Sequence, residues 1–208
     1  MHIELTEMLR CPETHEEAFL VMSTGEMVGR MVRSGILGCP VCRKEYPIVK
    51  GVVNFSARGP GEGLPPRQKY AVASGDPPRS PDAQTLQALL DLSGPGGYVV
   101  LVGSAARHAV GLAALMGGIH LIGVNAPADV EELPVLSLLA CETMIPLRRA
   151  MARAVVVGPE RASPPWLIEA LRVLLPGRRL VIEDELASAP AGLKQLAVGQ
   201  GLWVGERG

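Results

Sequence analysis

The chain has 208 residues and a formal net charge of −1 at pH 7, and aromatic residues make up 3% of it. A nearly neutral chain offers no electrostatic attraction to nucleic acid or to an anionic membrane surface, and scarce aromatic residues argue against a base-stacking surface. We therefore expect one good hydrophobic core, or one core with a small appendage, and no nucleic acid as the main partner.

The N-terminal letters MHIELTEMLR are charged and short of apolar residues, unlike a signal peptide. The longest apolar runs are interrupted by Gly, Arg or Glu, so we expect no membrane span and a cytoplasmic location. Thiols stay reduced in the cytoplasm. The four cysteines are therefore weighed as metal ligands or core residues before disulfides.

A candidate metal site lies in the N-terminal part of the chain. Cys39-Pro40-Val41-Cys42 is a knuckle whose tight turn aims two thiolates at one point, which suits tetrahedral zinc. Upstream, Cys11 begins a second pair, but a C-x-x-C spacing would place Thr14 in the site, and Thr14 is not a zinc ligand. The next residue, His15, makes C-x-x-x-H possible. The sequence thus predicts a Cys3His zinc site from Cys11, His15, Cys39 and Cys42, against the alternative of a ribbon that has lost its metal and keeps Cys11 as a small buried residue.

The rest of residues 1–56 is expected to be β-rich. We predict a hairpin of 19–22 with 27–32 around Ser23-Thr24-Gly25. Tyr46-Pro47-Ile48 should be an extended edge segment, because proline lacks a backbone donor, followed by a turn at Lys50-Gly51 and a return strand at Val52-Val53.

The segment RKEYPIVKGVVNF, residues 43–55, resembles the end of the small zinc-ribbon proteins that activate methyltransferases. The same kind of ribbon precedes the catalytic domain in some ribosomal RNA guanine methyltransferases. Lys50 replaces the acid usual in that pattern, and Val53 replaces the proline. A ribbon of this size buries little surface, so we expect it to depend on zinc or on docking to a larger domain.

Residues 57–82 are dense in Pro and Gly and are interpreted as a linker between a zinc-ribbon domain, 1–56, and a second domain, 83–208. The two parts should then be separate units. A lid over a cofactor cleft, with Tyr70 as a packing residue, is the alternative.

From residue 83 onward, helical and strand patterns alternate. We expect helices over 83–92, 103–115, 129–133, 164–175 and 193–198, and strands over 98–102, 119–124, 135–140, 154–157, 180–183 and 202–205. Such alternation predicts an α/β fold with a doubly wound, mainly parallel sheet.

The stretch ALRVLLPGRRLVIEDE, residues 170–185, resembles the helix–turn–strand R-V-L-x-P-G-G-x-L-V-I of class I S-adenosylmethionine-dependent methyltransferases, with Arg178 in place of the second glycine. The passage 144–158 resembles the one that leads into the fourth strand of that family, with Ala154 in place of its aspartate. The resemblance implies a Rossmann-like methyltransferase sheet with S-adenosylmethionine as the cofactor.

Two segments compete for the glycine-rich cofactor turn of that family. One is LLDLSGPGG, residues 89–97, but the β-branched run YVVLVG would then have to start a helix. The other, which we favour, makes YVVLV the first strand and places Gly103, Ser104 and Ala105 in the turn. Asn125 then stands where the family has the acid that binds the ribose hydroxyls.

Lost glycines, a lost acid and a C-terminal end with one helix and one strand weaken the case for an enzyme. The hypothesis we favour is therefore a methyltransferase-like protein with weakened or lost catalysis, which binds a protein partner. The alternative is an active methyltransferase acting on an unidentified substrate, RNA or protein. His108, His120 and Cys141 are interpreted as packing residues, and Arg148, Arg149 and Arg153 as an exposed basic face.

Overall fold

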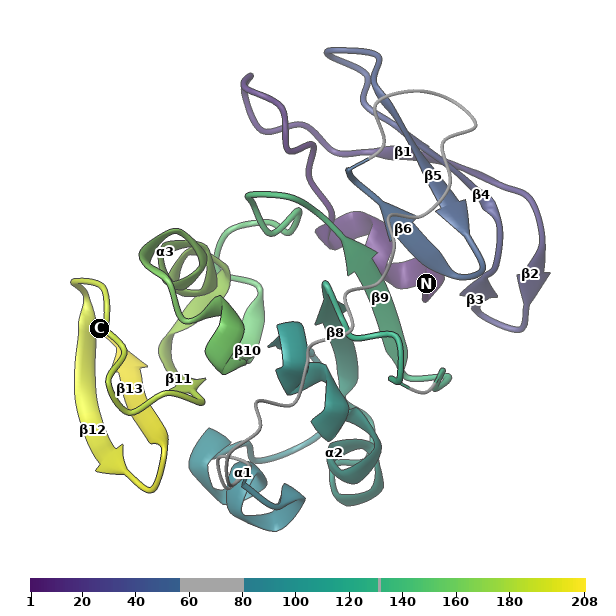
Figure 1. The fold of residues 1–208 in the computed structure, drawn as a ribbon. Coiled ribbons are helices and arrows are strands. Elements are labelled where there is room, and N and C mark those ends of the chain that lie inside the picture. Colours follow the sequence, from purple (N-terminus) through teal and green to yellow (C-terminus); the bar gives the residue numbers. More distant parts are fainter. Residues whose placement is uncertain (57–80, 131) are drawn as a thin grey trace.

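The computed structural model describes residues 1–56, 81–130 and 132–208, so the predicted linker and lid, with Tyr70, lie almost entirely outside the described residues. The described chain forms one sheet of 11 strands, a separate two-stranded ladder, and helices on both faces of the sheet (Figure 1). Its elements in chain order are η1 (Ile3–Met8), β1 (Val21–Thr24), β2 (Met27–Val28), β3 (Met31–Val32), β4 (Gly35–Gly38), β5 (Glu45–Val49), β6 (Val52–Asn54), α1 (Ala83–Leu90), β7 (Tyr98–Val102), η2 (Gly103–His108), α2 (Ala109–Leu115), β8 (His120–Val124), β9 (Leu136–Ala140), β10 (Ala152–Val157), η3 (Pro159–Arg161), α3 (Pro164–Val173), β11 (Leu174–Ile182), β12 (Leu193–Gly199) and β13 (Leu202–Arg207).

The centre of the sheet is parallel, in the order β6-β9-β8-β7-β10-β11. Its middle strand, β7, is the run YVVLV, whose side chains are buried alternately in two cores. Val99 and Leu101 join the core under α1 and α2, and Val100 and Val102 join the core under α3. A strand covered on both faces reads as a continuous apolar run. The prediction of a doubly wound α/β sheet, parallel at its centre, is confirmed.

The predicted ribbon is part of the same sheet. Its strands form the antiparallel series β1-β4-β5-β6, and β6 pairs in parallel with β9, placing Val52 opposite Leu138 and Asn54 opposite Ala140. The expectation of two separate units is therefore wrong for the described residues, because backbone pairing joins them. This pairing buries all three residues of β6.

Two local predictions in the ribbon are also wrong. Residues 19–22 do not pair with 27–32: β1 pairs with β4, and β2 and β3 form their own ladder around a turn in which Gly29 has φ +59°. Tyr46-Pro47-Ile48 is not at an edge, since β5 lies between β4 and β6. Proline is tolerated there because the registered pairs with β6 begin only at Ile48. The turn at Lys50-Gly51 and the return strand are confirmed, with φ +49° and +77° at the two turn residues.

The N-terminal segment covers one face of the sheet. Met1, Leu5 and Leu9 are completely buried and belong to the same core as Leu167 of α3. The connections 125–130 and 132–135, before β9, and 141–151, before β10, contain no α-helix in the described residues. The helical piece expected over 129–133 is thus absent from the described residues of that range. The 3-10 helix η1 instead helps to cover the face of the sheet on which α3 packs.

The C-terminal end differs from its prediction. The helix expected over 193–198 is β12, which pairs antiparallel with β13, and the expected last strand is confirmed. Gln200 and Gly201 join the two strands with φ +55° and +78°. Two consecutive residues with positive φ make a tight hairpin whose twist matches that of the strands. The domain is therefore not shortened in the way expected, because an antiparallel pair closes the sheet.

Candidate functional site

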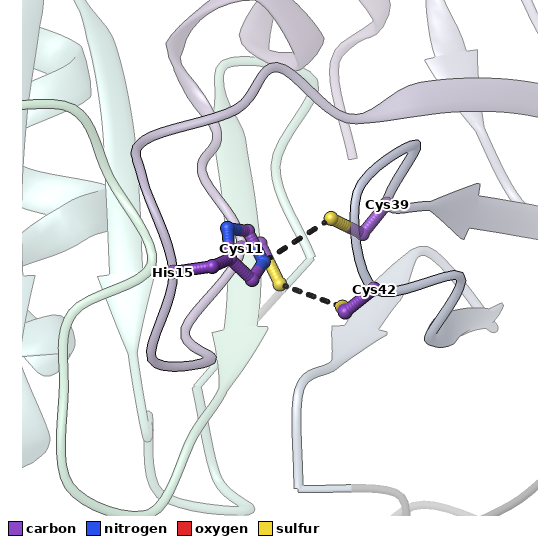
Figure 2. A group of neighbouring side chains, drawn as sticks. All are labelled: Cys11, His15, Cys39 and Cys42. Atoms are coloured by element: carbon purple, nitrogen blue, oxygen red, sulfur yellow. Dashed lines mark hydrogen bonds between the residues drawn. The ribbon is translucent and has the colours of Figure 1, made fainter.

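A cluster of three cysteines and one histidine lies in the ribbon, where two loops meet (Figure 2). Cys11 and His15 come from the segment after η1, and Cys39 and Cys42 from the turn between β4 and β5. One ligand atom from each residue lies within 4.8 Å of all the others. The sequence prediction of these four residues as neighbours therefore agrees with the geometry.

The separations in the cluster suit a tetrahedral ion. The sulfurs of Cys11 and Cys42 are 3.7 Å apart, and Nε2 of His15 is 3.4 Å from the sulfur of Cys39. Zinc bonds of about 2.3 Å to sulfur and 2.0–2.1 Å to nitrogen imply ligand separations of roughly 3.8 and 3.5 Å in a tetrahedron. The donor set fits zinc in both kind and spacing.

The knuckle is shaped by its own backbone. The N–H of Arg43 donates to the carbonyl of Cys39 at 2.9 Å, and Arg43 takes φ +61° to close the turn. Burial opposes ionisation of Cys39, but the N–H groups of Cys42 and Val41 bond its sulfur, and the net pKa is lowered to about 7. Burial raises the pKa of Cys11 to about 11. Because only the thiolate binds metal, Cys39 is the ligand prepared by the fold, and Cys11 would need the ion itself to lose its proton.

Neighbouring groups orient two of the four ligands. Nδ1 of His15 lies 2.6 Å from the carbonyl oxygen of Glu16, so an N–H at Nδ1 would leave Nε2 free for the cluster. The hydroxyl of Tyr46 lies 3.0 Å from the sulfur of Cys11, and burial keeps the pKa of Tyr46 far above its usual value, so this hydroxyl can donate. Carbonyl groups that fix the tautomer of a ligating histidine are typical of protein zinc sites. Lys44 pairs with Glu13 at 2.5 Å and ties the two loops together.

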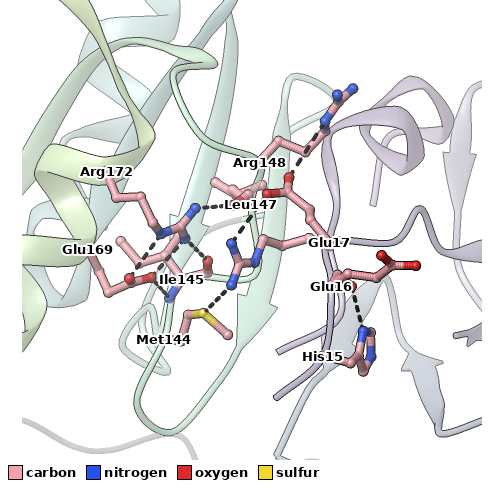
Figure 3. A network of polar contacts seen from close by, with 10 residues as sticks. His15, Glu16, Glu17, Met144, Ile145, Leu147, Arg148, Glu169 and Arg172 are labelled. Carbon is pink, nitrogen blue, oxygen red and sulfur yellow. Dashed lines mark hydrogen bonds and ion pairs between the residues drawn. The ribbon is translucent and has the colours of Figure 1, made fainter. Parts of the chain in front are cut away.

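The loop that carries His15 also contacts the large domain (Figure 3). Glu17 lies 3.5 Å from the guanidinium of Arg10 and 3.9 Å from that of Arg148. Arg148 also stacks over the ring of Phe19 at 4.5 Å, so it contacts the ribbon and is not simply part of an exposed basic face. Deeper in the domain, Arg172 donates to the carbonyls of Ile145 and Leu147, at 2.6 and 2.7 Å, and holds the segment before β10 in place.

The second predicted site lies at the carboxyl edge of the parallel strands. Gly103 follows β7 directly and has φ +66°, as a tight turn requires. The carboxylate of Glu160, in η3 after the neighbouring strand β10, covers Gly103. The N–H and hydroxyl of Ser104 both donate to Glu160, at 2.6 Å each, and a Cβ added at Gly103 would lie 1.9 Å from an oxygen of Glu160. Ala105 is completely buried in the core under α1 and α2.

The side chain of Asn125 also contacts other residues of the protein. It follows β8 with φ +53°, and its side-chain oxygen accepts the N–H of Cys141 at 2.9 Å. Its amide nitrogen lies 3.8 Å from the sulfur of Cys141. The side chain thus joins the ends of β8 and β9, and its hydrogen-bonding groups are turned to the protein itself.

A buried pair at the same edge was missed by sequence reasoning. Nε2 of His108, in η2, lies 2.5 Å from the carboxylate of Glu183, which follows β11, and the two side chains are only 11% and 9% exposed. The signal was weak, because the two residues are 75 positions apart.

The other candidate for the cofactor turn, residues 89–97, precedes β7 and lies at the opposite edge of the sheet. Arg153 donates there to four carbonyls, those of Ser93, Gly94, Pro95 and Gly96. Ligands of open α/β sheets bind at the carboxyl ends of the strands. The position of residues 89–97 therefore disfavours them as a cofactor turn, and Arg153 is a structural residue.

The groups at the carboxyl edge do not fit the cofactor that the resemblance implies. Gly103 and Ser104 are covered by Glu160, Asn125 bonds Cys141, and His108 bonds Glu183. In the described part of the chain, the groups predicted to bind a cofactor thus already have partners.

No protein-family model and no curated protein matches the chain. Similar solved structures include a chain in the complex of the Haloferax volcanii Trm112 methyltransferase activator (18% identity, 48% of this chain and 50% of that chain, TM-score 0.39). A second is geranyl diphosphate C-methyltransferase from Streptomyces coelicolor (18% identity, 48% of this chain and 41% of that chain, TM-score 0.41). A third is a SAM-dependent methyltransferase from Aquifex aeolicus (18% identity, 61% of this chain and 88% of that chain, TM-score 0.44). The match covers half or less of the first two. No helix among the described residues is long and apolar enough to span a membrane.

Proposed function

We propose that this chain is a methyltransferase-like protein that has lost catalysis, carries one structural zinc ion in its ribbon, and acts by binding another protein. The observation that carries the proposal is the contact of Glu160 with Ser104 over Gly103. A cofactor carboxylate or ribose entering this turn would have to displace a carboxylate that already holds both donors of Ser104.

The zinc ion has a structural role in this proposal. Four protein donors leave no open position for a substrate, as in other closed zinc sites. The loop that supplies Cys11 and His15 continues through Glu17 to Arg10 and Arg148. Zinc would therefore hold together both the ribbon and its contact with the sheet.

The ribbon offers the surface for a protein partner. β1 is an edge strand of the large sheet, Val21 on it is 65% exposed, and the neighbouring Phe19 is 57% exposed. A hollow of about 150 Å³ lies beside this edge, lined by Leu9, Glu17, Ala18, Phe19 and Arg148. Unpaired edge strands with apolar side chains are common places for another chain to add a strand.

The decisive experiment for lost catalysis is calorimetric titration of the zinc-loaded protein with S-adenosylmethionine and S-adenosylhomocysteine. We expect no heat and no thermal stabilisation at millimolar ligand. The variant Glu160→Ala shows whether the covering carboxylate alone closes the turn. Micromolar binding by the wild-type protein, lost in Gly103→Leu, would contradict the proposal and favour an active methyltransferase.

The partner surface is tested with a candidate partner isolated by cross-linking to the full chain. We expect Val21→Lys, at the β1 edge, to abolish its binding. The matched control, Val198→Lys on β12 at the opposite edge, should bind it normally, since Val198 is also exposed, at 48%. Equal binding by both variants would contradict the assignment to β1.

A further inference from the structure

A second group of metal-binding side chains lies at the amino end of β8, apart from the cysteine cluster. His2, Glu4 and His120 each offer one ligand atom, and the three atoms lie within 4.8 Å of one another. The rings of His2 and His120 are 4.5 Å apart, tilted by 51°. A carboxylate oxygen of Glu4 lies 3.8 Å from Nδ1 of His2.

The backbone holds these residues in place from several sides. His120 is the first residue of β8, directly opposite Tyr98 of β7. The N–H of His2 donates to the hydroxyl of Ser137, in β9, at 2.9 Å, and His2 forms a bridge with Met31. Glu4 lies in η1, two residues after His2, which is the N-cap of that helix. Two strands of the sheet and the ribbon thus fix the positions from which the three side chains converge.

Burial makes this grouping unusual. His2 is only 8% exposed, and Nδ1 of His120 is buried with no hydrogen-bond partner among the described residues. Buried imidazole nitrogens normally have a partner, and a group that lacks one calls for an explanation such as an ion. Glu4, in contrast, is half exposed and pairs with Arg30. An ion would therefore enter from the side of Glu4 and displace Arg30 from the carboxylate.

We propose that His2, Glu4 and His120 form a second metal site, specific for a divalent transition ion such as zinc. Two imidazoles and one carboxylate suit zinc, cobalt or iron(II) and are unlike the all-oxygen sites of magnesium and calcium. Three protein ligands leave at least one coordination position open, on the solvent side next to Glu4. This site differs from the cysteine cluster, whose four donors close the coordination sphere.

The test is the metal content of the full chain, measured after equilibration with buffered zinc and removal of loosely bound ions. We expect two zinc ions per chain in the wild-type protein and one in Glu4→Gln and in His120→Gln. The controls Glu7→Gln, on the same 3-10 helix, and Tyr98→Phe, beside His120, should keep two. Cys39→Ser should lose the ribbon ion and keep the ion of His2, Glu4 and His120, so the two kinds of variant remove different ions. If the ribbon holds no metal, the wild-type chain should bind one ion that Cys39→Ser keeps and Glu4→Gln loses.

Cobalt gives an independent reading of the donor set. Added to protein whose ribbon already holds zinc, cobalt should bind with d–d absorption but without the thiolate charge-transfer bands of a cysteine site. Retention of the ribbon ion in Glu4→Gln and His120→Gln shows that these variants fold. A wild-type chain whose only ion is lost in Cys39→Ser, or a second ion that survives in both Glu4→Gln and His120→Gln, would overturn the proposal.

Discussion

The polar groups of the cysteine cluster and those at the carboxyl edge of the sheet are arranged in opposite ways. In the cluster, three sulfurs and one imidazole nitrogen converge on one point, and neighbours such as Tyr46 and the carbonyl of Glu16 orient them towards it. At the carboxyl edge, Ser104 bonds Glu160 and Asn125 bonds Cys141. Groups that converge can hold a ligand, whereas groups that satisfy each other hold the fold together.

Removal of the ribbon's ion should have the largest effect. Cys39→Ser deletes the thiolate that backbone N–H groups stabilise, so the variant should lose zinc. Free zinc at about 1,000 times its Kd stabilises a folded chain by about 4 kcal/mol, and we expect a loss of that order in the free energy of unfolding. Urea denaturation with and without a chelator measures it.

The control for this variant is Cys141→Ala, which deletes a buried thiol outside the cluster. It should keep its zinc and its sensitivity to the chelator. Unfolding of Cys39→Ser at the same urea concentration as the wild-type protein would show that the cluster contributes no stability.

The second largest effect should come from shortening Leu5, a buried side chain of η1. This variant tests whether the ribbon and the rest of the sheet unfold together. Leu5 is fully buried in a core that it shares with Leu37 of the ribbon and Leu167 of α3. Leu5→Ala should cost about 2–5 kcal/mol because it leaves a cavity. Zinc release and the circular dichroism of the sheet should then shift together. Leu186→Ala, at a side chain that is 87% exposed, should change stability by less than about 0.5 kcal/mol. Two separate transitions would mean that the ribbon folds independently.

At the carboxyl edge, the removal of Glu160 should cost less. Glu160→Ala leaves the hydroxyl and N–H of Ser104 to water, and because this pair is exposed we expect a loss of about 1 kcal/mol. Glu160→Gln keeps acceptor capacity and should lose only part of that. Thermal unfolding of both variants measures the difference, and equal stability of Glu160→Ala and wild type would show that the contact is not formed in solution.

The smallest effect should come from Asp129. Its hydrogen bonds with Arg107 hold its pKa below the usual value, so the pair stabilises the fold above the usual carboxylate pKa. That stability is lost as the pH falls through the lowered pKa and Asp129 becomes protonated. Exposed pairs of this kind contribute about 0–1 kcal/mol. The difference between wild type and Asp129→Asn should be measurable at pH 6 and shrink as the pH falls below the usual carboxylate pKa. A difference that stays constant down to the lowest pH at which the protein is folded would exclude the charge as its cause.

Local patterns in the sequence were sufficient for much of this molecule. The continuous apolar run of β7 predicted its bounds, and the Cys39–Cys42 spacing predicted a turn with two converging thiolates. His15 was within reach of prediction because it directly follows Thr14, the position at which a C-x-x-C spacing would place a ligand. The Gln200-Gly201 hairpin turn was present in the sequence as well, but the helix-like letters 193–198 outweighed it.

Contacts between distant residues were beyond such reasoning. The pairing of β6 with β9 joins positions about 86 apart, as from Val52 to Leu138, and Ser104 meets Glu160 across 56 positions. The sequence by itself determined most of the central strands and helices, because periodicity and backbone preference are local properties. The tertiary structure decided which edge the ribbon covers and which polar groups remain available, because hydrogen-bond partners are chosen only when the chain has brought them together.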